Sequence, residues 1–356
     1  MQRKNRSLGF NIGDFILLIL LLIMLFIVKK PLIQLSSISL VALNLLIVVS
    51  AVTILTLTIK IRNMVFIGFS GFSPVFIRLT TPIVITGVTG TGKTCFTKYL
   101  LRKLRKKFKV MVFDWNDEYS NVAVSTTISI SNYKFRILSR RDAIEARDLI
   151  AASLNLTDPQ TNLLGKILSS LIGSEVYIKD LVKHIGNYPV DDTVTLTVRE
   201  ALLRKISPFT GGEDMLDFQN VNDGAIVIDG GEVERKVGYA LILKDLWQRK
   251  IREGRKKDFD MILVIEEAHN LIPYRDNSEL SVFERWILEI RKYGVVTILV
   301  SPSMSLLSNV VSANTAMYIN FIEPRRAKIK LYSKEFNINV PSLKDEIDVN
   351  YINKIT

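Results

Sequence analysis

Two long apolar runs near the N-terminus contrast with the short apolar runs spaced through the rest of the chain. Phe15–Val28 is an uninterrupted run of 14 apolar residues, and Leu32–Ile59 is a second run of 28 residues with few polar interruptions. A helix needs about 20 apolar residues to cross the core of a bilayer. The second run therefore predicts a membrane-spanning helix, and the first predicts one if residues 8–14 extend it.

The charges around these runs predict a tight helical hairpin that turns at residues 29–31. Basic residues lie before the first run and after the second, namely Arg3, Lys4, Arg6, Lys60 and Arg62. Because positive charge favours the cytosolic side, both ends of the hairpin are expected there. The alternative is that the first run is the apolar core of a signal peptide, but no small-residue cleavage site follows it before the second run. We expect residues 1–62 to form a membrane anchor with two transmembrane helices, and residues 63–80 to form a connector.

From residue 81 onward, short buried-strand patterns alternate with helical patterns. The strand patterns lie at 83–85, 110–113, 225–229, 261–265, 295–300 and 317–321. This alternation predicts an α/β domain over residues 81–356 with a mostly parallel sheet. Residues 141–207 are helical in pattern and predict an inserted helical subdomain, in which Asp158 and Asp192 are candidate N-caps. Residues 122–137 alternate between apolar and polar positions and predict a hairpin.

The charge of the chain favours a polyanionic partner or an anionic membrane surface without deciding between them. The net charge is +12, and residues 1–62 contribute half of it through seven Lys/Arg against Asp14. Residues 98–109 carry seven Lys/Arg in twelve positions, which predicts either a solvated helix face or a surface that contacts phosphates. Cys95 is the only cysteine, which excludes an intrachain disulfide and suits a domain in the cytosol.

Residues 87–94 contain the first strong chemical signal, a glycine-rich turn that fits G-x-x-x-x-G-K-[ST] between a strand and a helix. Glycines let backbone N–H groups converge on the phosphates of a nucleotide. The residues expected to contact ATP are Gly87, Thr89, Gly90, Thr91, Gly92, Lys93, Thr94 and Cys95. Lys93 is placed to reach the β- and γ-phosphates, and the Thr94 hydroxyl to bind Mg²⁺.

A second strong signal is the pair of acids that follows the apolar strand at 261–265. Glu266 is expected to hold the Mg²⁺ shell, and Glu267 to polarise the attacking water as general base. Polar residues 114–120 follow another strand at the edge where doubly wound sheets bind ligands. Arg285 and Arg291 lie in a helical pattern, where each is either a surface ion-pair residue or a finger that reaches the nucleotide of a neighbouring subunit.

Five segments in this order resemble the HerA side of the HerA/FtsK superfamily of P-loop ATPases, over about residues 80–335. They are GVTGTGKT at 87–94, FDWNDEYS at 113–120, VIDGGE at 227–232, VIEEAHNLIP at 264–273 and ILEIRKYGVVTILVSPS at 287–303. The resemblance implies a RecA-like, additional-strand sheet and a hexameric ring with DNA in its channel. It also implies that Lys93 and Thr94 bind the nucleotide, Glu266 holds Mg²⁺, Glu267 is the catalytic base and Arg291 is a finger given in trans.

The chain departs from this family pattern at three places. The membrane hairpin replaces the small β-barrel that precedes the motor, the polar loop is shortened to Ser301-Pro302-Ser303, and Ile290 replaces the glycine before the finger motif. A membrane-anchored motor of this kind is similar to conjugative coupling proteins and to archaeal DNA-import ATPases. We therefore expect a multi-pass protein of the cell membrane with a cytoplasmic ATPase domain, which forms a homo-hexamer and moves DNA at a pore protein. The alternatives are an ATPase for protein secretion or pilus assembly, and a nucleotide-gated membrane scaffold with little turnover.

Overall fold

The computed structural model describes residues 64–341, apart from 80, 129, 131–132, 211–222, 276–279 and 332–333. The chain divides into two units, Met1–Asn63 and Met64–Thr356. The two predicted membrane helices belong to the first unit and lie outside the described residues. Within the described ranges, no helix is both long enough and apolar enough to cross a membrane.

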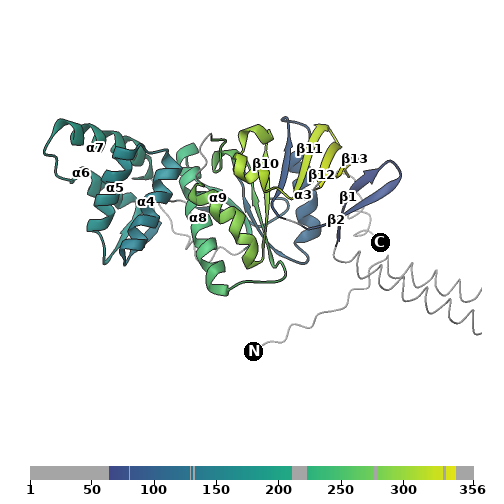
Figure 1. The fold of residues 1–356 in the computed structure, drawn as a ribbon, viewed down its shortest axis with the longest axis horizontal. Coiled ribbons are helices and arrows are strands. Elements are labelled where there is room, and N and C mark those ends of the chain that lie inside the picture. Colours follow the sequence, from purple (N-terminus) through teal and green to yellow (C-terminus); the bar gives the residue numbers. More distant parts are fainter. Residues whose placement is uncertain are drawn as a thin grey trace, which may run out of the picture. The chain divides into compact units, whose positions relative to one another are not determined.

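The second unit is built on a sheet of eleven strands (Figure 1). In spatial order the strands are β2 (Ser73–Arg78), β1 (Met64–Ser70), β13 (Lys334–Asn339), β12 (Arg326–Leu331), β11 (Met317–Glu323), β3 (Ile83–Gly87), β10 (Val295–Ser301), β9 (Met261–Ile265), β4 (Lys109–Phe113), β8 (Gly224–Ile228) and β5 (Ser125–Ile128). Pairing is parallel from β11 through to β5, and antiparallel from β11 through β12, β13 and β1 to β2. The predicted mostly parallel α/β sheet is confirmed.

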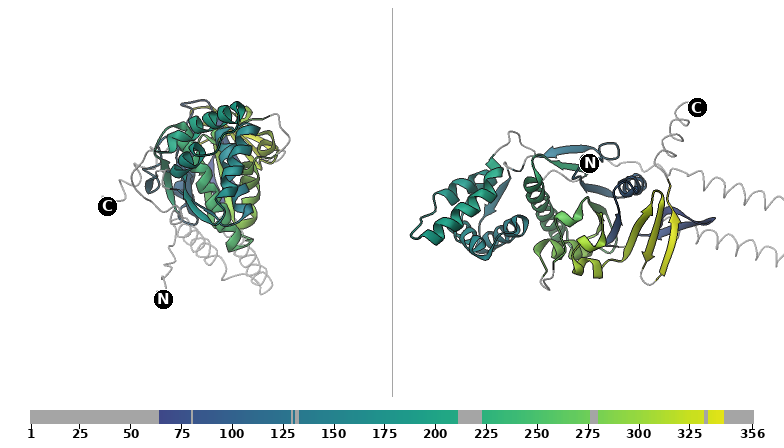
Figure 2. Two further views of the ribbon diagram at one scale, coloured as in Figure 1. Left: turned by 90° about the vertical axis from the view of Figure 1, so that its left-hand side faces the viewer. Right: turned by 90° about the horizontal axis from the view of Figure 1, so that it is seen from above.

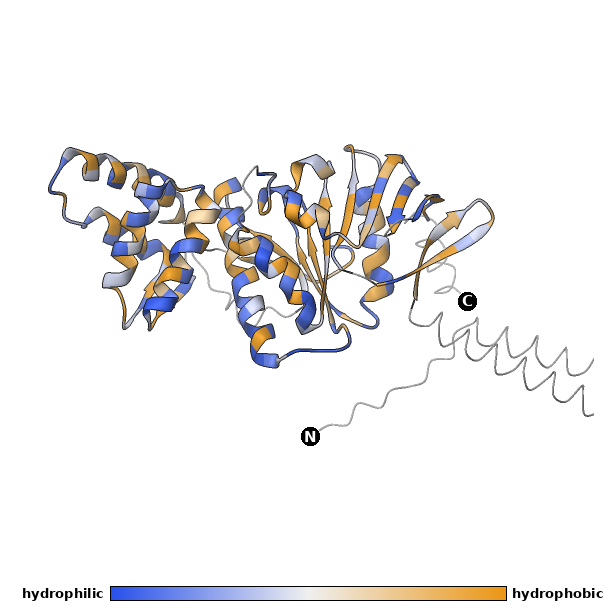
Figure 3. Cartoon of the chain, viewed as in Figure 1, coloured by the Kyte–Doolittle hydropathy of each residue, from blue (hydrophilic) through white to orange (hydrophobic). Residues whose placement is uncertain are grey.

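The central strands are mostly apolar and buried along their whole length because helices cover both faces of the sheet. Every residue of β9 and β10 is buried. Helix α3 (Lys93–Leu104) packs through its leucines on one face, together with the side chains of β3. Helices α8 (Glu232–Glu253) and α9 (Val282–Glu289) cover the other face. Figure 3 shows this arrangement as hydrophobic strands between helices whose outer surfaces are polar.

Four helices and a two-stranded sheet form a group at one end of this unit, as Figure 1 and the right view of Figure 2 show. They are α4 (Arg140–Leu154), α5 (Asp158–Ser170), α6 (Leu181–Gly186) and α7 (Thr193–Ile206), with β6 (Lys134–Ile137) paired to β7 (Ser174–Tyr177). The Asp192 side chain caps α7 by accepting from the Thr195 amide. Asp158 is the first residue of α5 instead of its cap, because Thr157 and Gln160 form a capping box one position earlier.

The predicted hairpin at 122–137 is wrong. Strand β5 pairs in parallel with β8 in the large sheet, whereas β6 pairs antiparallel with β7 in the small one. Alternation of apolar and polar residues indicates a half-buried strand but does not identify its partner. Two consecutive strands that belong to different sheets therefore give the same pattern as a hairpin.

The described part of the predicted connector forms the hairpin β1–β2, which ends the large sheet (Figure 1). Strand β2 is the edge strand. Strand β1 meets β13 through a single register pair, Phe69 with Asn339. A Cβ on Gly68, whose φ is +148°, would lie 2.3 Å from the Asn339 carbonyl oxygen, so only glycine allows this approach.

Candidate nucleotide site

The glycine-rich loop joins the carboxyl end of β3 to the start of α3, as the sequence predicts. Gly87 has a φ of +148°, and a Cβ there would lie 2.7 Å from the Cβ of Phe321 on β11. Gly90 and Gly92 also have positive φ, at +85° and +99°, but a Cβ on either would meet open space. Gly87 is therefore required by packing. The two later glycines are required by their backbone conformation and leave the outer side of the loop open.

The start of α3 presents free backbone donors to this open side. Its N-cap, Gly92, provides no side-chain hydrogen bond, so the first N–H groups of the helix have no side-chain cap. Lys93 Nζ donates only to the Val88 carbonyl, at 3.2 Å, within the loop itself. Thr91 Oγ1 donates to the same carbonyl at 2.7 Å and closes the turn. An uncapped helix N-terminus beside a half-buried lysine is suited to binding phosphate oxygens.

Glu266 lies at the end of β9 and is joined to the loop through the first turn of α3. Thr94 Oγ1 donates to Glu266 Oε1 at 3.1 Å, and the Tyr119 hydroxyl donates to Oε2 at 2.6 Å. The Glu266 side chain is buried, with 3% of its surface exposed. Burial raises the pKa of Glu266 to about 7, although both hydrogen bonds act to lower it.

The loop after β4 positions Tyr119 against Glu266. The Asp114 carboxylate accepts the backbone N–H groups of Glu118 and Tyr119, both at 2.9 Å, and thereby closes a turn. Burial raises the pKa of Asp114, while these two hydrogen bonds lower it. Burial and the neighbouring charge of Glu266 raise the pKa of the Tyr119 hydroxyl well above its usual value. The sequence places residues 114–120 as a group at this edge, but it does not identify Tyr119 as the residue that contacts Glu266.

Glu267 has a strained backbone and stands partly exposed next to Glu266. Its φ is +46°, a left-handed conformation that non-glycine residues rarely adopt. His269 Nδ1 lies 3.4 Å from Glu267 Oε2. Strain of this kind persists where the surrounding structure imposes it, and it is concentrated at functional sites. Glu267 therefore combines a strained backbone with a partly exposed carboxylate that lies beside His269.

The loop after β10 contacts the phosphate-binding loop. The Gly87 amide donates to the Pro302 carbonyl at 3.2 Å, and Ser301 Oγ donates to the Ser303 carbonyl at 3.1 Å. The shortened Ser301-Pro302-Ser303 segment therefore supports the first glycine of the loop.

The structure does not bring Arg291 to the other predicted catalytic residues of the same chain. Arg291 is exposed in the turn Ile290–Tyr293, which precedes the amino end of β10. Strands β10, β9 and β3 are parallel, so Lys93 and Glu266 lie at the opposite, carboxyl ends. Within one chain Arg291 therefore does not reach the nucleotide site, and both predicted alternatives, a surface residue and a finger in trans, stay open.

The donors at this edge fit Mg²⁺ bound together with a nucleotide. Magnesium is usually held through one or two carboxylates or hydroxyls plus substrate phosphates and water. Glu266 and Thr94 supply one carboxylate and one hydroxyl at hydrogen-bonding distance from each other. The described residues contain no group of three or more His, Cys, Asp or Glu that could hold a metal alone. The protein thus offers a partial shell, which the phosphates of a nucleotide would complete.

The fold and part of the sequence match known proteins. Residues 73–207 match the family "Helicase HerA, central domain". VirB4 of Thermoanaerobacter pseudethanolicus has a similar fold, with a TM-score of 0.57 and 13% identity over 80% of this chain and 97% of that one. The bacterial conjugative coupling protein TrwBdeltaN70 has a TM-score of 0.51 and 11% identity over 78% of this chain and 89% of that one. No curated protein matches the chain in sequence. These structural matches show a shared fold, and at identities of 13% and 11% they show no more than that.

Proposed function

We propose that this chain, a P-loop ATPase of the HerA/FtsK type, uses ATP hydrolysis to move DNA at a membrane. The observation that carries the proposal is the carboxyl edge of the sheet. There the open phosphate loop, the Thr94–Glu266–Tyr119 network and the strained Glu267 meet in a chain that matches the HerA central domain.

Each residue at this edge has a distinct role in the proposed reaction. The loop amides and Lys93 would hold the phosphates, and Thr94 and Glu266 would hold Mg²⁺, which neutralises phosphate charge when bound. Glu267 would orient a water and accept its proton as it attacks the γ-phosphate. Tyr119 would fix the position of the Glu266 carboxylate.

A ring of subunits is proposed because Arg291 is exposed at the edge of the sheet opposite its own nucleotide site. Within the described part of the chain, Arg291 makes no ion pair with an acidic side chain. An exposed arginine of this kind suits a finger that stabilises the transferring phosphate of a neighbouring subunit. We propose that the ring is a homo-hexamer, as the resemblance implies.

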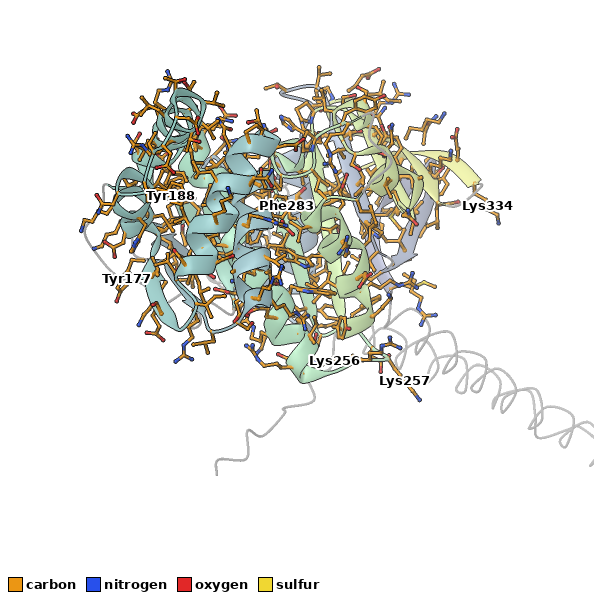
Figure 4. The ribbon with its side chains drawn as sticks, turned by 60° about the vertical axis from the view of Figure 1, so that its left-hand side comes forward. Tyr177, Tyr188, Lys256, Lys257, Phe283 and Lys334 are labelled. Carbon is orange, nitrogen blue, oxygen red and sulfur yellow. The ribbon has the colours of Figure 1, made fainter. Side chains whose placement is uncertain are left out.

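DNA is the proposed cargo because the segment that follows the phosphate loop is strongly basic. Residues 93–108, which form α3 and the turn after it, contain no Asp or Glu of their own. The basic segment 249–257 differs, because Lys250 and Lys256 form ion pairs with Glu253 and Asp260. Figure 4 shows Lys256 and Lys257 in the turn that follows α8. We therefore assign contact with DNA phosphates to α3, not to the end of α8.

Membrane anchoring by residues 1–62 completes the proposal. The two apolar runs and their flanking basic residues support a hairpin with both ends in the cytosol, where ATP is available. A pore protein in the same membrane would then receive the DNA.

The decisive experiment measures ATP hydrolysis by the full chain in lipid vesicles, with and without DNA. We expect DNA to stimulate wild-type turnover and to have no effect on Lys93→Ala, which lacks the charge that faces the phosphates. Stimulation by a pilin or secreted protein in place of DNA would favour the secretion ATPase. Turnover that stays near zero with either ligand, despite ATP binding, would favour the nucleotide-gated scaffold.

A mixing experiment tests the proposed ring. Arg291→Ala is expected to bind ATP and fail to hydrolyse it, and Lys93→Ala to fail in its own site. If Arg291 acts in trans, mixing the two variants restores part of the activity, because each supplies the half-site that the other lacks. The exposed Arg285→Ala serves as a matched control, expected to retain wild-type turnover. Mixtures as inactive as the separate variants would contradict a role for Arg291 in trans.

A further inference from the structure

The hairpin β1–β2 is uncharged although one of its faces is exposed. Met64–Ile77 contains no Asp, Glu, Lys, Arg or His. The exposed fractions of Phe69, Phe72 and Phe76 are 45%, 104% and 39%. An antiparallel hairpin with one face in water normally alternates apolar with polar residues. Because β2 is also the edge strand of the sheet, an apolar surface here invites association.

A β-bulge gathers the exposed rings on one face of the hairpin. The pairing register shifts between Phe66 and Gly68, so Phe66 and Phe69 lie on the same face despite their odd spacing. The Phe66 ring centroid is 5.1 Å from that of Phe69 and 5.5 Å from that of Phe76, its cross-strand partner. The opposite face is formed by side chains buried in the core of the sheet, namely Val65, Ile67 and Ile77.

We propose that this aromatic face, formed by Phe66, Phe69 and Phe76 with Phe72 at the turn, lies in the interfacial layer of a lipid bilayer. The inference rests on the proposed membrane anchor. The second apolar run ends at Ile59, five residues before β1 begins. Five residues span at most about 18 Å, so a membrane-spanning run would keep the start of β1 within that distance of the membrane surface.

The chemistry of the hairpin suits a lipid surface better than water or a nucleic acid. Amphipathic elements that lie in the interfacial layer carry residues such as Phe, Trp and Leu on the face that enters the lipid. Basic residues border the uncharged stretch on both sides, as Lys60 and Arg62 before it and Arg78 after it. Such residues attract anionic headgroups near the membrane surface. The uncharged face itself offers no cation for DNA phosphates, which argues against the cargo as its occupant.

Tryptophan quenching in the full chain tests the contact directly. Phe72→Trp is made in protein reconstituted into vesicles of phosphatidylcholine and phosphatidylglycerol, with and without brominated acyl chains. Phe72 is fully exposed in a turn, so the fold should tolerate the change, and the native Trp115, Trp247 and Trp286 are buried at 6%, 9% and 4% exposure. The matched control is Val194→Trp, on a side chain that is 71% exposed at the start of α7.

We expect brominated lipid to quench the new emission of Phe72→Trp by roughly half and to leave Val194→Trp near the wild-type signal. Equal signals from the two variants in vesicle-bound protein would overturn the hairpin contact and leave the anchor standing. Vesicle flotation in alkaline carbonate distinguishes the lipid contact of the hairpin from the membrane anchor at residues 1–62. Protein that carbonate releases from the vesicles would overturn the anchor itself. The lipid assignment would likewise be overturned if the emission of Phe72→Trp changed with duplex DNA, or with the number of protein molecules per vesicle, and not with brominated lipid.

Discussion

Strand β9 has a carboxylate just beyond each end, and the two acids differ in what surrounds them. Asp260, at the amino end, contacts two lysines, with Lys250 Nζ at 3.1 and 3.2 Å from its two oxygens and Lys256 as the second partner. Glu266, at the carboxyl end, receives hydrogen bonds from two hydroxyls and, among the described residues, from no cation. Glu266 is nevertheless the more buried of the two, because it is fully buried whereas Asp260 is half-buried.

The difference separates a structural edge of the sheet from a functional one. A buried carboxylate without a cation is destabilising, so Glu266 is suited to a positive partner from outside the protein, as the proposed function requires. At the amino edge the ion pairs are complete, and nothing further is needed for the charges to be stable. The predictions below test this division, from the largest expected effect to the smallest.

The largest effect is expected from Glu267→Gln. Loss of a general base lowers turnover by about 10²- to 10⁴-fold while ATP binding is kept. The matched change at the amino edge, Glu253→Gln, should leave turnover unchanged. Steady-state ATPase rates and nucleotide affinity for both variants provide the measurement. Wild-type rates for Glu267→Gln would move the base to another residue, with Glu266 as the candidate.

The next effect concerns stability and pH without nucleotide. The pKa of Glu266 is raised from 4.5 to about 7, so the folded state binds this proton more tightly than the unfolded state. The wild type should therefore lose stability as pH rises from about 5 to 8, by up to about 3 kcal/mol from this group. Glu266→Gln should remove that loss and raise the melting temperature at pH 8 but not at pH 5. If Glu266→Gln melts with the same pH dependence as the wild type, burial of the Glu266 carboxylate is not the cause of that dependence.

Tyr119→Phe should affect Glu266 by removing a hydrogen bond that positions its carboxylate. The change removes one hydroxyl and leaves Glu266 Oε2 without its donor, at a cost of about 1–3 kcal/mol in stability. The pKa of Glu266 should rise further, which moves the acidic limb of the ATPase pH profile towards higher pH. Tyr133→Phe is the control, because its hydroxyl donates to the buried Asp245 at 3.0 Å, away from the site. Equal shifts of the pH profile in both variants would contradict a positioning role for Tyr119.

The smallest effect is expected at the structural edge. Lys250→Met removes the buried cation between Glu253 and Asp260, while Lys256 continues to contact both acids. Because these acids are partly exposed, the loss in unfolding free energy should be about 1–2 kcal/mol. Urea unfolding measures it, and the ATPase rate should not change. A large loss of turnover at normal stability would show that the two edges are coupled.

The sequence was sufficient to predict the parallel strands, the phosphate loop and the two acids after β9, because each has a local signature. The contact between Tyr119 and Glu266 joins residues 147 positions apart and has no local signature. Side-chain pairing across a sheet depends on strand order, which a single sequence does not provide. The same limit explains why β5 and β6 were predicted as one hairpin.

Charge patterns were the least informative part of the sequence. The basic segment at 249–257 resembles the one at 98–109, yet ion pairs with Asp260 and Glu253 neutralise two of its lysines. The partner Asp260 lies just outside the segment and belongs to the turn before β9. A run of lysines therefore predicts an exposed positive surface only when the acids that fold against it are also known.

The single register pair between β1 and β13 has a mechanical consequence. The β1–β2 hairpin is connected to the phosphate loop through the ladders β13–β12–β11–β3, and the β12–β13 ladder has six register pairs. Within the sheet, load applied at the hairpin would meet the single pair of Phe69 with Asn339 before the longer ladders. The chain itself offers a shorter route, because only residues 79–82 separate β2 from β3, the strand that leads into the phosphate loop. The Tyr99 hydroxyl, which donates to the Phe66 carbonyl at 3.2 Å, also ties the hairpin to α3, the helix that follows the loop. A pull on the hairpin would therefore reach both ends of the phosphate loop, while its pairing with β13 would yield first.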